Sequence, residues 1–140
     1  MWMAAVAAVG LASAFAANAQ LSPIAPADVK WQAAGQGPGA AKIAVLEGDL
    51  LQPGPFTVRM RVPAGYVFEP HWHDGAEHVT VISGTVYVVF GDKIDRKKGK
   101  ICLPGAYLAI PAGAHHGAWA QTAATLQIHG VGPLGMHPVR

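Results

Sequence analysis

Short apolar runs separated by turn residues fill the chain after about residue 41 and favour a β-structure over any helical fold. The clearest run is 56–62, in which Phe56, Val58, Met60 and Val62 alternate with polar side chains. Alternation with a period of two is typical of a strand that has one buried and one exposed face. Similar runs occupy 43–46, 67–73, 77–83, 85–90, 101–103, 107–110, 115–120 and 125–130. The sequence therefore predicts an all-β sandwich or barrel.

The length and charge of the chain exclude several classes of protein. Its 140 residues suit a single domain, and with half the residues apolar and only 13% charged it is unlike a disordered chain. The formal net charge of +2 gives no reason to expect nucleic acid or an acidic membrane as a partner. The sequence thus predicts a small globular domain, and a small molecule or a carbohydrate is the partner that we expect for it.

The first residues differ from the rest and predict export. Residues 1–17 are Ala-rich and uncharged, and Ala17-Asn18-Ala19 follows as a small-x-small cleavage pattern, although no Lys or Arg precedes the apolar run. We interpret 1–19 as a signal peptide, with an N-terminal helix as the alternative. We therefore expect a secreted or periplasmic protein that is no longer attached to the membrane after cleavage. Residues 20–41, rich in Pro, Gly and Ala, are expected to form an extended arm before a barrel domain over 42–140.

Five of the seven histidines fall in two short windows, 71–78 and 115–116. His71 and His73 are two apart in a predicted strand, so both imidazoles project to one side. We expect Glu77 to return to that side from the paired strand of a hairpin, and a distant strand to complete a metal site. Imidazole suits Zn, Cu, Fe and Ni, whereas an added carboxylate suits Fe(II) and Mn(II). A His-x-His pair alone is also common in purely structural roles. The single cysteine, Cys102, is interpreted as a small buried side chain, with a thiolate ligand as the alternative.

The spacing around these residues resembles the two conserved motifs of the cupin superfamily. The first motif is matched by Gly65-x5-His71-Trp72-His73-x3-Glu77-x6-Gly84, and the second by Gly105-x5-Pro111-Ala112-Gly113-x2-His116. Ala120 stands where the second motif usually ends in Asn. Within the superfamily the chain is similar to small, single-domain, quercetin-dioxygenase-like proteins.

This resemblance implies a double-stranded β-helix, or jelly-roll barrel. It also implies one divalent metal ion per chain (Cu, Fe, Mn, Ni or Zn), ligated by His71, His73, Glu77 and His116. Glu77 is also a candidate catalytic base. Strand parity and position suggest Glu69, Val79, Tyr87 and His129 as substrate-binding candidates.

The expected function is that of a metal-dependent oxidoreductase or dioxygenase that activates O2. Three alternatives stay open. One is a copper enzyme that cleaves polysaccharides such as cellulose, with Trp72 and Trp119 binding sugar. Another is a non-redox isomerase or lyase, and the third is a binding module without turnover. The apolar arm suggests a homodimer by analogy with other cupins.

Overall fold

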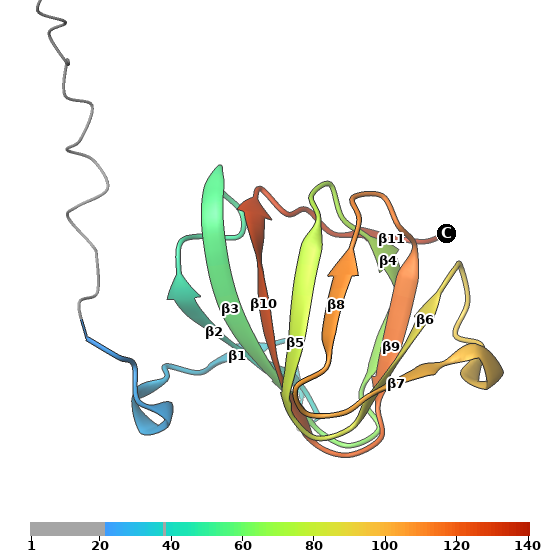
Figure 1. The fold of residues 1–140 in the computed structure, drawn as a ribbon, viewed down its shortest axis with the longest axis horizontal. Helices are drawn as coiled ribbons and strands as arrows, with labels where there is room; N and C mark the ends of the chain where they lie inside the picture. The colour runs from blue at the N-terminus through green and yellow to red at the C-terminus, as the bar shows by residue number, and fades with distance from the viewer. Residues whose placement is uncertain (1–21, 38) are drawn as a thin grey trace, which may run out of the picture.

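The protein is described here from a computed structural model that covers residues 22–37 and 39–140, so the predicted signal peptide lies outside the described residues. Two antiparallel sheets face each other (Figure 1). The six-stranded sheet has the order β1 (Gln32–Ala34), β2 (Ala41–Glu47), β3 (Gly54–Val62), β10 (Ala124–Gly132), β5 (Glu77–Ser83) and β8 (Tyr107–Ile110). The five-stranded sheet has the order β11 (His137–Pro138), β4 (Val67–Trp72), β9 (His116–Ala120), β6 (Val86–Phe90) and β7 (Lys100–Cys102). The predicted all-β jelly roll is confirmed.

The helical content of the described chain is limited to two short 3-10 turns, η2 (Pro26–Asp28) and η3 (Arg96–Lys98). In residues 22–37 and 39–140 there is no helix long and apolar enough to cross a membrane.

The core lies between the two sheets and follows the alternation seen in the sequence. Phe56, Val58 and Val62 of β3 are at most 3% exposed, whereas Arg61 on the other face is exposed. The paired strand β10 buries Leu126 and Ile128 on the same side. Burying such side chains contributes about 1.5–3 kcal/mol each, so the inward faces of the strands hold the sandwich together.

The predicted hairpin between 67–73 and 77–83 is wrong. β4 and β5 belong to opposite sheets, because the short connection 74–76 carries the chain from one layer of the sandwich to the other. Glu77 therefore faces the histidines from across the barrel. At the other end of the barrel the chain crosses back at Gly84, where φ is +81° and a Cβ would lie 2.2 Å from the carbonyl oxygen of Ala123.

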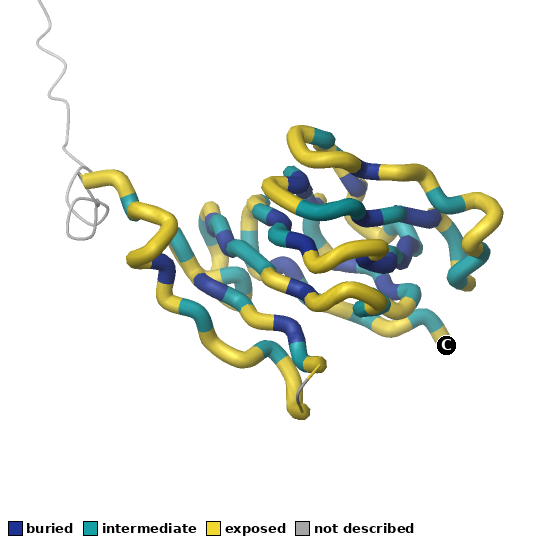
Figure 2. The backbone as a smooth tube through the Cα atoms, turned by 90° about the horizontal axis from the view of Figure 1, so that it is seen from below, coloured by how far each residue is buried: buried dark blue, intermediate teal, exposed yellow. Residues whose placement is uncertain are grey.

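The predicted arm contributes to the sheet as well as preceding it. Its last part, β1, pairs with β2 in the register Gln32 with Ile43 and Ala34 with Ala41. The residues before β1 extend from one side of the barrel and are largely exposed (Figure 2). Val29 is the exception, with 7% of its surface exposed.

A segment that we call the C-terminal strap, residues 134–139, crosses one end of the barrel beside β4 (Figure 1). The amide of Asp74 donates a hydrogen bond to the carbonyl of Leu134 at 2.9 Å, and the amide of Val139 donates to the carbonyl of Pro70 at 3.0 Å. The strap is thereby fixed against the stretch that carries His71 and His73.

Candidate metal centre

Three histidines and one glutamate converge at the end of the barrel that the C-terminal strap crosses. His71 of β4 is the direct cross-strand partner of His116 of β9, and His73 follows β4 by one residue. Glu77 is the first residue of β5 and comes from the opposite sheet. Each side chain offers one ligand atom within 4.8 Å of the others, and all four residues are at most 7% exposed. The four residues proposed from the spacing are thus brought together.

The outer nitrogens of the three imidazoles are held by main-chain carbonyls. Nδ1 of His71 bonds to the carbonyl of Glu69 at 2.6 Å, and Nδ1 of His116 to that of Ala114 at 2.9 Å. Nδ1 of His73 bonds to the carbonyl of Gly135 in the C-terminal strap at 2.5 Å. Because a carbonyl only accepts, each Nδ1 carries the proton, and each Nε2 presents its lone pair to the centre. Such outer hydrogen bonds orient metal-ligating histidines.

One inner nitrogen lacks a protein partner that would satisfy it. Among the described residues, Nε2 of His73 is the one buried side-chain N or O atom with no hydrogen-bond partner. The carboxylate Oε2 of Glu77 lies 3.4 Å from Nε2 of His73 and 3.3 Å from Nε2 of His116. An unpaired buried nitrogen costs about 1–3 kcal/mol unless something binds it. A metal ion ligated by three Nε2 atoms and a carboxylate would satisfy all four groups, so the residues fit one divalent ion.

The charges within the cluster shift its pKa values. Burial would raise the pKa of Glu77, but interactions with His116 and His73 outweigh it and lower the pKa to about 2. Burial would lower the pKa of His73, but the adjacent carboxylate of Glu77, the bond to the carbonyl of Gly135 and the nearby carboxylate of Asp74 raise it overall. Burial, reinforced by the two neighbouring imidazoles, lowers the pKa of His71. The carboxylate is thus ionised at neutral pH, as a metal ligand must be.

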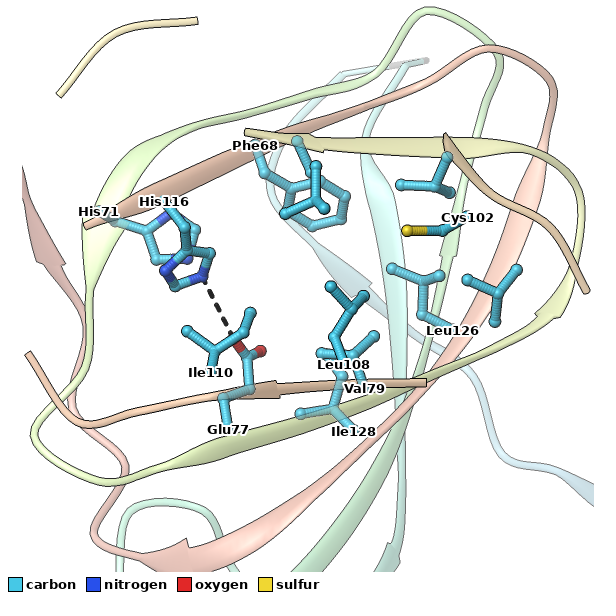
Figure 3. A pocket seen from close by; sticks show the side chains of 14 residues that line it. Phe68, His71, Glu77, Val79, Cys102, Leu108, Ile110, His116, Leu126 and Ile128 are labelled. Carbon is cyan, nitrogen blue, oxygen red and sulfur yellow. Dashed lines mark ion pairs between the residues drawn. The ribbon is translucent and has the colours of Figure 1, made fainter. Parts of the chain in front are cut away.

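An apolar pocket extends from the cluster into the barrel (Figure 3). His71, Glu77 and His116 form one end, and Cys102 and Leu126 lie at the other. Burial raises the pKa of the Cys102 thiol. Cys102 is not among the residues that could share the metal, so the alternative that it is a ligand is not supported.

Of the four substrate-binding candidates, Val79 alone lines the pocket. Glu69 is exposed because a β-bulge interrupts β4. Phe68 pairs with Ala118 and His71 with His116, so three steps on β4 match two on β9. The extra residue reverses the alternation, so that Phe68 points inward in place of Glu69. Sequence parity cannot reveal a bulge, and Phe68 was missed for this reason.

Tyr87 and His129 lie on the outer faces of the sheets. Tyr87 stacks on Trp119 with ring centroids 5.0 Å apart, while its neighbours Val86 and Val88 line the pocket. His129 is exposed and stacks on His78 at 4.9 Å. Neither residue reaches the pocket, because alternation along the strand turns it outward.

The remaining aromatic candidates also have defined places. Trp72 faces outward and stacks on His137 at 4.1 Å. His115, the sequence neighbour of His116, bonds to Asp92 at 2.6 Å and faces away from the cluster. Trp119 is only 4% exposed and is covered by Tyr87, so the prediction that it offers a sugar-binding surface is wrong.

Comparison with known proteins agrees with this geometry. A family model described as the ChrR cupin-like domain matches residues 20–134. The chain belongs to this cupin family. No curated protein matches the sequence of this cupin.

Solved structures share the fold of this cupin at low sequence identity. An RmlC-like cupin from Shewanella frigidimarina is 19% identical, with a TM-score of 0.62 over 76% of this chain and 86% of the other. The polyketide cyclase RemF from Streptomyces resistomycificus is 18% identical, with a TM-score of 0.68 over 86% of each chain. A candidate acetylacetone dioxygenase from Methylibium petroleiphilum is 22% identical, with a TM-score of 0.62 over 81% and 78%. At these identities the likeness establishes the fold alone.

Proposed function

We propose that this cupin is a metal-dependent oxidoreductase that activates O2 at one divalent ion held by His71, His73, His116 and Glu77. The observation that carries the proposal is the convergence of these four buried side chains on a single point. Bound there, a redox-active ion such as iron, copper or manganese would supply electron transfer between O2 and the substrate.

The protein side chains have defined roles in this proposal. The main-chain bonds to Nδ1 fix the imidazoles with Nε2 inward, which spares the site from reorganising when it is occupied. Glu77 offsets part of the metal charge. The apolar walls keep water away from the reacting end.

The scarcity of acid–base groups favours redox chemistry over the isomerase or lyase alternative. A lyase needs a base whose pKa lies near the working pH, whereas the pKa of Glu77 is about 2. Among the pocket-lining residues the other titratable groups are His71, His116 and Cys102. The two histidines are assigned to the metal, and burial raises the pKa of the Cys102 thiol. We therefore assign Glu77 as a ligand in preference to a base.

The glycan-cleaving alternative has less support. A small apolar pocket does not suit a polysaccharide chain, and one of the two tryptophans proposed to bind sugar is buried. The binding-module alternative is distinguished from the proposed function only by turnover.

Metal content and oxygen uptake test the proposal together. We expect one metal ion per chain by elemental analysis, its loss in His71→Ala, and its retention in His129→Ala, a matched change at an exposed histidine. Acetylacetone, the compound in the name of one structural neighbour, is the first probe for oxygen uptake. A full complement of metal in His71→Ala would refute the ligand assignment. Turnover without O2 consumption would favour the non-redox alternative.

We also propose export and assembly as a homodimer. Export rests on the Ala-rich stretch 1–19, and dimer formation on the exposed arm that precedes β1. Mass spectrometry of the N-terminus from cells and sedimentation analysis test the two points. An intact Met1 would contradict cleavage, and a monomer at micromolar concentration would contradict the dimer.

A further inference from the structure

We propose that the substrate of this cupin is a small apolar molecule with a single oxygen-bearing end. Its oxygen end faces the metal and its carbon chain extends toward Cys102. The inference rests on the proposed metal centre and adds the class of molecule that the centre takes. The inference is drawn from the pocket, which is polar at one end and apolar at the other (Figure 3).

The polar groups of the pocket are confined to one end. Of the 14 lining residues, His71, Glu77 and His116 are the three whose side chains carry nitrogen or oxygen. The other lining side chains are hydrocarbon apart from the sulfur of Cys102. All three polar side chains belong to the metal cluster. A substrate oxygen therefore finds partners at the metal end and none along the walls.

The deep end of the pocket would penalise polar atoms. Cys102 is 5% exposed, and its thiol points to the carbonyl of Lys100 at 3.7 Å, a weak contact. The neighbouring walls include Val81, Val88 and Leu126, each at most 5% exposed. A hydroxyl placed there would lose its water without gaining a partner, which weakens binding by about 10- to 100-fold. Sugars, which carry a hydroxyl on nearly every carbon, are thereby excluded.

The size of the pocket limits the length of the molecule. The space open to the centre of a water molecule is about 60 Å³. Since one water needs at least about 10–15 Å³ on this measure, the pocket holds roughly four to six waters. A substrate of about that many non-hydrogen atoms fills it, as butanoate would with its four carbons and two oxygens.

A homologous series of carboxylates on the zinc-loaded protein tests the inference without turnover, because zinc has no redox chemistry. We expect calorimetric affinity to rise about fourfold per methylene from acetate, to peak near butanoate, and to fall for octanoate. Glutarate, in which a second carboxylate replaces the terminal methyl of pentanoate, should bind at least about 100-fold more weakly. Flat affinity along the series, or glutarate equal to pentanoate, would overturn the inference.

A size variant sharpens this test. Leu126→Ala enlarges the deep end and should move the optimum to a longer acid by about two carbons, whereas Ile82→Ala, at an exposed position, should leave it in place. An unchanged optimum in folded Leu126→Ala would count against the proposed placement of the tail.

A second measurement needs no metal. Cys102 is the single cysteine of the chain, so its modification reports access to the deep end. After correction for rates on glutathione, we expect methyl methanethiosulfonate to label metal-free protein at least about 100-fold faster than its 2-sulfonatoethyl analogue. Cys102→Ser gives the background. Equal corrected rates would refute an apolar deep end.

The two proposals fail in different ways. A chain-length optimum and selective labelling, without oxygen uptake by iron- or copper-loaded protein, would uphold the inference and refute the proposed oxidoreductase. Oxygen uptake with a sugar, accompanied by equal labelling rates, would do the reverse.

Discussion

Glu77→Gln should change how the metal-free protein responds to acid. The carboxylate lies 3.4 Å from Nε2 of His73 and 3.3 Å from Nε2 of His116, and its pKa is lowered from 4.5 to about 2. A pKa lowered in the folded state stabilises the fold above the unfolded value, and this stabilisation is lost as the pH falls toward the folded value. The window of acid sensitivity therefore lies between about pH 4.5 and 2.

The size of the effect follows from the shift. A lowering of about 2.5 units at 1.36 kcal/mol per unit corresponds to roughly 3 kcal/mol of unfolding free energy, most of it lost by pH 2. Gln cannot be titrated, so the variant should lack this component. Other carboxylates titrate in both proteins, so the difference between the two profiles reports Glu77 together with its effect on the pKa of His73.

Urea denaturation of chelator-treated protein between pH 6 and 2, followed by tryptophan fluorescence, measures the effect. Over this range the unfolding free energy of the wild type should fall by about 3 kcal/mol more than that of Glu77→Gln. Glu69→Gln, at an exposed carboxylate, should follow the wild-type profile. Parallel profiles for wild type and Glu77→Gln would refute the claim that the histidines hold this carboxylate ionised.

Three further results are expected. Gly135→Ala should weaken metal binding by about 10- to 100-fold in chelator competition. The φ of Gly135 is +62° and an added Cβ would lie 2.0 Å from Oδ2 of Asp74, so the substitution displaces the carbonyl that orients His73. Unchanged affinity would contradict this role of the strap. Zinc affinity should fall as pH drops from 8 to 5.5, since protons compete for the imidazoles and the raised pKa of His73 starts that competition above pH 6.5; a pH-independent affinity would place the metal elsewhere. Phe56→Ala should cost about 3–5 kcal/mol in urea denaturation, because the ring is 1% exposed, and a loss below 1 kcal/mol would mean that the core collapses around the gap.

The four side chains of the metal centre could be proposed from the sequence because each stands at a ligand position of one of two short motifs that resemble those of the cupin superfamily. His71 and His73 share a side through local strand geometry, and the offsets to Glu77 and His116 match a family pattern. The route by which Glu77 arrives could not be inferred, since a three-residue connection fits a hairpin as well as a crossing between sheets.

The pocket walls were less predictable than the metal ligands. Parity counting assumes an unbroken strand, and the bulge between Phe68 and His71 exchanges Glu69 for Phe68 at the wall. Nothing in the sequence near Gly135 indicates that its carbonyl orients His73, because this contact is made by the main chain. Contacts through main-chain atoms leave little trace in residue type.

The link between His73 and Gly135 spans 62 residues of chain. At a synthesis rate of about 5–20 residues per second, a growing polypeptide carries His73 for roughly 3–12 s before Gly135 has been added. During that interval the bond that orients the imidazole cannot form, and any ion captured would meet a histidine that is not yet held in place. We therefore expect a metal ion to bind this centre after folding, unlike in small domains in which a few neighbouring ligands gather an ion and fold around it.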